Sequence, residues 1–313
     1  MGVLASKKLA FVFPGQGSQA VGMGNDLAES FSAAADIFAR ADEVLGHSIS
    51  GLCFNGPEDE LKRTINTQPA LYVTSAAAFE VAKKNGFVAT YTAGHSVGEY
   101  AALYAAGAFS FETGLRLVRT RAELMQKAGE TNAGAMAAIL GLSPEQVQEA
   151  VEKASGIGIV VAANFNSPIQ TVISGDKKGV ARASEIAVEI GAKRVVPLNV
   201  GGAFHSPLMQ SAADALADEL RAAEIADPAV PIVANCTADF ETTANQVREN
   251  LAKQITGSVR WVESVQRMLD SGVDAFIELG SGNVLAGLIK RIAPEAEVHS
   301  VGDRESVEAL LAV

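Results

Sequence analysis

Residues 93–99 read AGHSVGE, and nowhere else in the chain does a serine have glycine two positions before it and two positions after it. Residues 90–93 are typical of a short buried strand, and residues 99–106 are typical of a helix. A strand that turns sharply into a helix needs small residues on both sides of the turn, because Cβ atoms would clash there. The pattern predicts a nucleophile elbow with Ser96 at its tip and the Val97 N–H free where an oxyanion would form. The alternative is a glycine-flanked serine in an ordinary loop.

The composition is typical of a soluble α/β enzyme, because 48% of the 313 residues are hydrophobic and 19% are charged. The net charge of −11 argues against general binding to nucleic acid or to an anionic membrane. No segment has the apolar length needed to span a bilayer. Cys53 and Cys236 have neither metal-binding nor redox spacing, so we expect buried free thiols in a reducing cytoplasm.

A glycine-rich turn follows the first predicted strand, residues 8–13. Gly15, Gly17 and Ala20 fit the relaxed fingerprint of a dinucleotide-binding turn. That fold needs a second strand ending in an acidic residue about 20 residues further on, whereas residues 26–45 have the apolar spacing of one amphipathic helix. We therefore exclude a dinucleotide site and expect a turn whose backbone N–H groups can approach a ligand closely.

Residues 133–198 have the pattern of a separate small unit. Their predicted β-α-β-β-α-β order is typical of a ferredoxin-like subdomain. Its two helices begin after the capping residues Ser143 and Asp176, and residues 164–168 are expected to form the loop between its second and third strands. The four predicted strands are residues 135–140, 157–163, 170–174 and 192–197.

The rest of the chain, residues 1–132 and 199–313, alternates strands with helices. This alternation predicts an α/β fold with a mostly parallel sheet covered on both faces. The predicted helices after residue 45 are residues 57–64, 68–85, 111–128, 207–223, 245–255, 262–269 and 283–291, and the later strands are residues 230–235 and 273–279.

A serine nucleophile needs a base, usually histidine, and the chain has four. His95 adjoins the serine, but flanking side chains on a tight turn diverge. His47 follows a surface helix, and His299 lies near the C-terminal end. His205 stands in the sequence GGAFHSP, a loop between a predicted strand and a helix, where α/β enzymes carry their chemistry. Elimination favours His205 as the base, the alternative being a structural histidine.

A catalytic triad would also need a carboxylate to orient the imidazole. Asp239, Asp274 and Glu278 are candidates, each better explained as a solvated or capping residue, so the residues leave the orienting group open. Arg121 lies on a helix close after the elbow helix and can reach the same cleft, where a guanidinium fork would bind a carboxylate. The alternative, which the residues by themselves favour, is a surface helix arginine paired with Glu123 or another acid.

Five motifs occur in the order found in one enzyme family: FVFPGQGSQ at 11–19, TQPA at 67–70, GHSVGEY at 94–100, NFNSP at 164–168 and GAFHS at 202–206. Together they resemble the malonyl-CoA:acyl carrier protein transacylases of bacterial fatty-acid synthesis. The resemblance covers nearly the whole chain. It implies an α/β-hydrolase-like subdomain (1–132 and 199–313) that carries a ferredoxin-like insert (133–198). It also implies malonyl-CoA as substrate, acyl carrier protein as partner, and neither a metal nor a permanently bound cofactor; we expect a cytoplasmic monomer.

The resemblance implies that Ser96 is the nucleophile, that His205 is its base and that Arg121 grips the free carboxylate of malonate. The N–H groups of Gln16 and Val97 would form the oxyanion hole. Other implied site residues are Gln254, whose main-chain carbonyl would orient the histidine, Phe204, which is of the malonyl rather than the methylmalonyl type, and the cleft residues Gln68, Asn164 and Asn166.

Two stretches depart from the family pattern. Residues 257–261, GSVRW, lack the proline usual before the valine, and residues 280–283, GSGN, replace a common Gly-Pro-Gly-Lys. The first bears on the backbone near Gln254, and the second removes a basic contact to the carrier or coenzyme. Two rival functions stay open: a serine esterase, which would transfer acyl groups to water, and a carrier-binding module that is never acylated.

Overall fold

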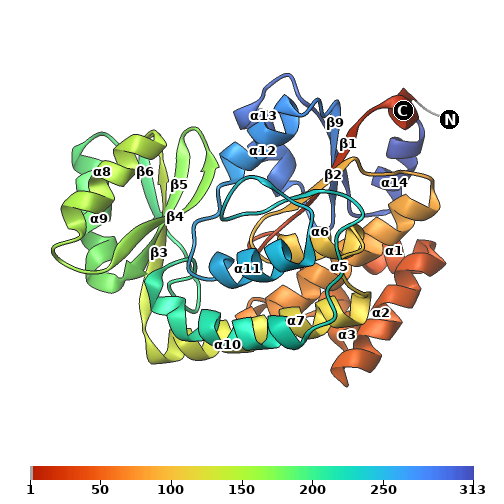
Figure 1. Cartoon of the computed structure of the whole chain (residues 1–313), viewed down its shortest axis with the longest axis horizontal. Helices are drawn as coiled ribbons and strands as arrows, with labels where there is room; N and C mark the ends of the chain where they lie inside the picture. Colours follow the sequence, from red (N-terminus) through yellow and green to blue (C-terminus); the bar gives the residue numbers. More distant parts are fainter. Residues whose placement is uncertain (1–2) are drawn as a thin grey trace.

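The computed structural model describes residues 3–313, which form two lobes of unequal size (Figure 1). The larger lobe contains a six-stranded sheet with the order β10-β9-β1-β2-β7-β8. Neighbouring strands are parallel except for the β7–β8 pair. The strands are β1 (Leu9–Phe13), β2 (Tyr91–Gly94), β7 (Ile232–Val233), β8 (Phe240–Glu241), β9 (Ala275–Leu279) and β10 (Glu297–Val301). The expected α/β class with a mostly parallel sheet is confirmed.

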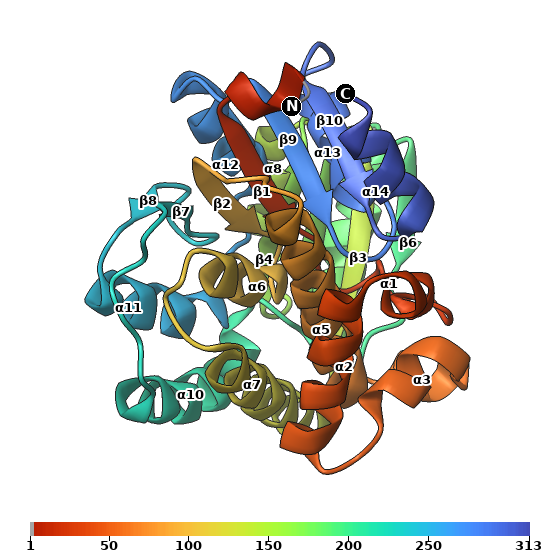
Figure 2. The same cartoon turned by 90° about the vertical axis from the view of Figure 1, so that its right-hand side faces the viewer.

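Helices cover both faces of this sheet, which is why β1 is apolar throughout its length. Phe11 and Phe13 pack on the face covered by α5 (Thr64–Lys84), α6 (Gly98–Ala105) and α14 (Arg304–Leu311). Ala10 and Val12 pack on the other face, covered by α12 (Trp261–Asp270) and α13 (Val284–Ile292). Figure 2 shows α5 running beneath the strands. The lobe also contains α1 (Asn25–Ser30), α2 (Ser32–Leu45), α3 (Ile49–Asn55), α4 (Glu58–Leu61), α7 (Phe111–Thr131), α10 (Gln210–Ala222), α11 (Ala244–Gln254), and the 3-10 turns η1 (Val3–Ser6) and η2 (Pro207–Met209).

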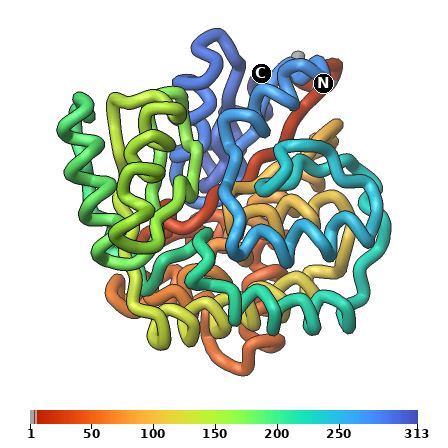
Figure 3. Tube along the Cα trace, turned by 60° about the vertical axis from the view of Figure 1, so that its left-hand side comes forward, coloured from red at the N-terminus to blue at the C-terminus, as the bar shows by residue number. Residues whose placement is uncertain are grey.

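The smaller lobe is an antiparallel four-stranded sheet with the order β4-β5-β3-β6, backed by two helices. In Figure 3 its yellow-green to green segment lies at the left of the view, beside the rest of the tube. Both helices begin at the predicted caps, because the side chain of Ser143 accepts a hydrogen bond from Gln146 N–H and that of Asp176 from Gly179 N–H. Its elements are β3 (Gly134–Leu140), α8 (Pro144–Ala154), β4 (Val160–Ser167), β5 (Gln170–Asp176), α9 (Lys177–Glu189) and β6 (Arg194–Pro197).

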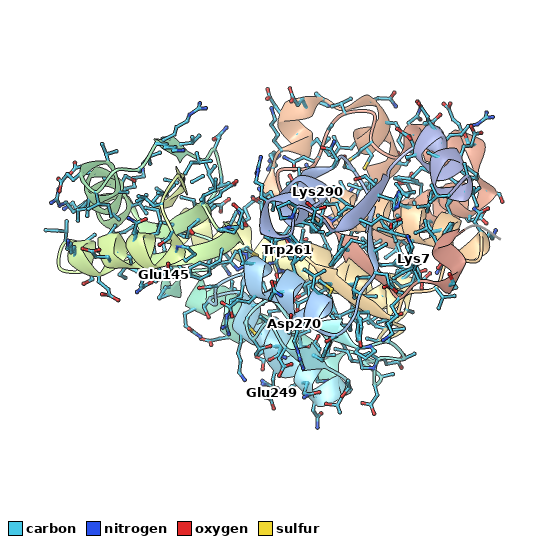
Figure 4. The ribbon with its side chains drawn as sticks, turned by 90° about the horizontal axis from the view of Figure 1, so that it is seen from above. Lys7, Glu145, Glu249, Trp261, Asp270 and Lys290 are labelled. Carbon is cyan, nitrogen blue, oxygen red and sulfur yellow. The ribbon has the colours of Figure 1, made fainter. Side chains whose placement is uncertain are left out.

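The two lobes meet along β4, against which α12 and α13 pack. Phe165 N–H donates to the Val259 carbonyl, and Val259 N–H donates to the Ala163 carbonyl, so the segment before α12 is hydrogen-bonded to the strand. Trp261, the first residue of α12, lies near this junction (Figure 4). The same segment therefore holds the small lobe beside the carboxyl ends of β1 and β2, where the elbow lies.

Some local predictions are wrong. Residues 26–45 form two helices rather than one, because Phe31 is extended (φ −131°) between α1 and α2, and apolar spacing that continues across such a break cannot reveal it. Residues 164–167 are not a loop but the end of β4, which bulges there and so keeps pairing with β5. The predicted strand 230–235 shortens to β7, and β8, β10, α3 and α14 were not predicted.

Candidate active site

The turn between β2 and α6 has the geometry of a nucleophile elbow. Ser96 has a positive φ of 52°, a strained conformation for a residue with a side chain. A Cβ atom on Gly94 would lie 2.0 Å from the carbonyl carbon of Gly98, and one on Gly98 would lie 2.1 Å from the carbonyl oxygen of Phe13. Both glycines of the motif are therefore required by close backbone contacts, and they leave the serine at the tip of the turn.

His205 is the histidine that faces Ser96, as elimination predicted. Its Nε2 lies 2.8 Å from Ser96 Oγ. Its Nδ1 lies 2.8 Å from the Gln254 carbonyl oxygen and 3.1 Å from that of Gly257. Because carbonyl oxygens only accept hydrogen bonds, Nδ1 carries the proton and Nε2 is left free to accept one from the serine. The loop is strained here as well, since His205 has a φ of 57°.

The sequence left open which group orients the imidazole, and in the structure two main-chain carbonyls are hydrogen-bonded to it. All three candidate carboxylates have other roles. Asp239 pairs with Arg267 at 3.0 Å, and Asp274 accepts a hydrogen bond from Lys8 N–H. Glu278 accepts hydrogen bonds from the first N–H groups of α13. None of these carboxylates orients the imidazole.

Burial decides the charge of the base. The His205 side chain is buried, and desolvation together with the nearby Arg121 charge lowers its pKa to about 3. The imidazole is therefore neutral at pH 7. A neutral imidazole whose Nε2 faces a hydroxyl is in the state required of a general base.

Arg121 is the most unusual charged residue of the site. It is only 1% exposed, and among residues 3–313 no carboxylate lies within ion-pair distance of its guanidinium. Its Nη2 donates to Ser96 Oγ at 3.2 Å and to Gln254 Oε1 at 2.9 Å, and its Nη1 donates to Gln68 Oε1. The alternative partner, Glu123, is bound by Arg119 instead. A buried cation without a protein counter-ion, in contact with the nucleophile, is suited to an anionic ligand.

The predicted residues surround one cavity of about 490 Å³. All of them line it except Gln254, whose carbonyl supports the histidine from behind. The lining includes Gln16, Gln68, Ser96, Val97, Arg121, Asn164, Asn166, Phe204 and His205. The structure therefore brings predicted site residues as far apart in the sequence as Gln16 and His205 into a single crevice between the lobes.

Two backbone N–H groups in this cavity suit an oxyanion. Within the described part of the chain, neither Gln16 N–H nor Val97 N–H donates a hydrogen bond to another protein group. The glycine-rich turn reaches the elbow closely, because a Cβ atom on Gly15 would lie 2.4 Å from the His95 carbonyl oxygen. The His95 side chain points away from the serine, and its Nε2 lies 2.8 Å from Asn166 Oδ1.

Sequence reasoning missed two residues that support the elbow. Asn235 accepts the Ser96 N–H through Oδ1 at 2.7 Å and donates through Nδ2 to the Gly94 carbonyl at 2.6 Å. Glu99, in the first turn of α6, is buried and accepts hydrogen bonds from Asn235 and Gln254. The available signals were weak: an asparagine just after a short strand, and an acidic residue inside an otherwise apolar helix.

The fold and the geometry of the site are those of an acyl-transferring enzyme. Residues 10–304 match the acyl transferase domain, and the chain belongs to that family. The malonyl CoA-acyl carrier protein transacylase of Bacillus subtilis is 46% identical, over 96% of this chain and 95% of its own. This confirms the predicted resemblance, and the chain is an acyltransferase of this kind.

Solved structures agree in fold. The acyl carrier protein S-malonyltransferase of Vibrio cholerae has a TM-score of 0.94 at 43% identity, covering 97% of this chain and 99% of its own. A malonyl-transacylase in complex with its type II polyketide synthase acyl-carrier protein has a TM-score of 0.95 at 42% identity, with the same coverage. That relative therefore binds an acyl carrier protein.

Proposed function

We propose that the chain moves a malonyl group from malonyl-CoA to the phosphopantetheine thiol of acyl carrier protein, through a malonyl ester on Ser96 and in two alternating half-reactions. The observation that carries the proposal is the buried Arg121 guanidinium, without a carboxylate partner among the described residues and 3.2 Å from the nucleophilic oxygen. The names of the relatives support the donor and the acceptor.

In the first half-reaction, His205 Nε2 takes the proton of Ser96 Oγ as the oxygen attacks the thioester carbonyl. The carbonyl oxygen becomes negative and accepts hydrogen bonds from the N–H groups of Gln16 and Val97. When the tetrahedral intermediate collapses, the carbon–sulfur bond breaks. The proton on His205 then passes to the departing coenzyme A thiolate, which leaves a malonyl ester on the serine.

In the second half-reaction the carrier thiol enters the vacated channel. His205 removes its proton, the thiolate attacks the ester carbonyl, and the same N–H groups hold the negative oxygen. Collapse breaks the bond to Ser96 Oγ, which regains the proton from His205. The main-chain carbonyl of Gln254 keeps the imidazole oriented through both steps.

Arg121 selects the acyl group in this proposal. The malonyl carboxylate accepts hydrogen bonds from two N–H groups of the guanidinium. The side-chain oxygens of Gln68 and Gln254 accept two others and so fix the orientation of the guanidinium plane. Phe204 lines the same cavity and limits the space for a branch on the acyl chain. Asn164 and Asn166, on β4, offer amide groups to the donor's polar chain.

The wider arrangement supports further parts of the proposal. We assign residues 1–132 and 199–313 to an α/β-hydrolase-like subdomain and residues 133–198 to a ferredoxin-like insert, on the basis of the two sheet orders.

Among the described residues, no helix is long and apolar enough to cross a bilayer. The free thiols of Cys53 and Cys236 support a cytoplasmic location, and we propose a monomer without a bound metal or cofactor.

The test is to incubate the protein with malonyl-CoA and to look for a malonylated Ser96 peptide by mass spectrometry. We expect the ester in the wild type and none in Ser96→Ala. Adding holo-acyl carrier protein should discharge it to malonyl-carrier. An ester that is lost to water as fast as to the carrier would favour the serine-esterase alternative, and no ester at all would exclude the proposal.

A further inference from the structure

Glu99 is a fully buried carboxylate that does not line the active-site cavity. Its Oε2 accepts a hydrogen bond from Asn235 N–H at 3.0 Å and another from Gln254 Nε2 at 2.8 Å. Within the described residues its Oε1 has no partner. Burying a carboxyl group with one unpaired oxygen is unfavourable.

The side chain of Gln254 connects this carboxylate to the catalytic groups. Its Nε2 donates to Glu99 and also to the Ser96 carbonyl at 3.0 Å, and its Oε1 accepts from Arg121 Nη2 at 2.9 Å. Only this orientation of the amide matches donors with acceptors. In the flipped orientation, an N–H group would face the guanidinium N–H groups and an oxygen would face the Glu99 carboxylate.

The amide also separates Glu99 from Arg121. A carboxylate in direct contact with the guanidinium would occupy its fork with two hydrogen bonds and leave little room for a substrate carboxylate. With the Gln254 amide in between, Glu99 binds the amide nitrogen, and the arginine donates to a single oxygen on that side, Gln254 Oε1. Other N–H groups of the fork then remain available on the cavity side.

We propose that Glu99 is a positioning residue for acyl-group selection: by fixing the Gln254 amide it holds the Arg121 guanidinium in the orientation that receives a malonyl carboxylate. The inference rests on the proposed role of Arg121. It does not involve the His205 pathway, because the histidine is oriented by main-chain carbonyls rather than by the Gln254 side chain.

The test compares Glu99→Leu with Glu99→Gln, measuring kcat/KM for transfer from malonyl-CoA and from acetyl-CoA to the same carrier. In Glu99→Leu the amide loses its fixed orientation, and we expect the malonyl-to-acetyl ratio to fall about tenfold, the scale of one hydrogen bond to a charged group. In Glu99→Gln the new side-chain oxygen can accept both hydrogen bonds, so the ratio should stay within about threefold of the wild type.

Glu241→Gln is the matched control. Glu241 is also a buried acidic side chain with one unpaired oxygen among the described residues, but its hydrogen bond comes from Asn250 Nδ2 at 2.8 Å and it has no hydrogen bond to Gln254. We expect this variant to keep the wild-type ratio. If Glu99→Leu does not fold, Gln254→Met tests the same bridge, because it removes the amide but keeps the main-chain carbonyl that supports His205; the same fall in ratio is expected.

Three results would overturn the inference: an unchanged ratio in folded Glu99→Leu, an unchanged ratio in Gln254→Met, or a loss in Glu99→Gln as large as that in Glu99→Leu. Arg121→Ala separates this failure from failure of the proposed function. If Arg121→Ala loses malonyl selectivity while the Glu99 variants keep it, the function stands and the inference falls. If Arg121→Ala keeps selectivity, the carboxylate anchor itself is wrong.

Discussion

Replacing Arg121 with alanine removes a buried guanidinium that donates a hydrogen bond to Ser96 Oγ, the proposed nucleophile. Two of its N–H groups suit a malonyl carboxylate: the Nη1 hydrogen not used by Gln68, and the Nη2 hydrogen now directed at Ser96 Oγ. Acetyl-CoA has no carboxylate to bind. The variant should therefore lose malonyl transfer selectively.

The magnitude follows from those two hydrogen bonds. Each hydrogen bond to a charged group contributes about 1.5–3 kcal/mol, so losing both raises the barrier for malonyl transfer by about 3–6 kcal/mol. This corresponds to a fall in kcat/KM of roughly a hundredfold to ten-thousandfold. Transfer from acetyl-CoA should change by less than about tenfold, because Ser96, His205 and the two oxyanion N–H groups keep their positions.

The assay measures kcat/KM for both donors with the same holo-carrier, and circular dichroism checks the fold. Arg121→Lys keeps the charge but not the fork, so an intermediate loss is expected. Arg119→Ala, on the same helix but paired with Glu123 at the surface, should behave like the wild type. Equal losses for malonyl and acetyl donors in Arg121→Ala would refute the anchor role.

Three further outcomes are expected. Because the pKa of His205 is lowered to about 3, the imidazole stays neutral in mild acid. We therefore expect no fall in kcat/KM near pH 6.5 as the pH is lowered towards 5, and such a fall would contradict the lowered pKa. Burial raises the pKa of Glu241 to about 8, so the folded state holds a proton that the unfolded state releases above about pH 4.5, and stability falls as pH rises between these values. Glu241→Gln should flatten that fall in urea titrations, and an unchanged slope would contradict it. Gly98→Ala places a Cβ atom 2.1 Å from the Phe13 carbonyl oxygen and should cost at least about 2 kcal/mol of unfolding free energy. Gly287→Ala, on α13 with no heavy atom within 4 Å of its new Cβ, should be neutral or stabilising by up to about 1 kcal/mol, and equal effects of the two would contradict the steric account.

The predictable parts of the site were those with a local steric or chemical signature. The need for Gly94 could be predicted from the sequence because its close contact is with Gly98 of the same turn, whereas the Phe13 carbonyl that requires Gly98 lies on a distant strand, β1. His205 could be found because only four histidines compete for the role of base. Arg121 lies four residues from both Leu117 and Met125, so helical spacing places it on the covered face of α7, but that spacing does not show that this face borders the cavity.

The features of the site that the sequence did not predict depend on contacts between residues far apart in the chain. The histidine is oriented by main-chain carbonyls, which every residue has and which therefore leave no mark on the sequence. Asn235 N–H and the Glu99 carboxylate meet across 136 positions of the chain. In the fold, apolar spacing predicted the alternation of strands and helices, but it missed the break at Phe31, because the buried stripe of α1 continues into α2.

The hydrogen bonds that hold the nucleophile set the order in which activity can arise during synthesis. The N–H of Ser96 is bound by Asn235 and its carbonyl by Gln254, both far towards the C-terminus. A nascent chain that has exposed only its first 200 residues carries the serine without its base and without either support. We therefore expect a chain still in synthesis to react with thioesters only after the segment up to Gln254 has emerged and folded.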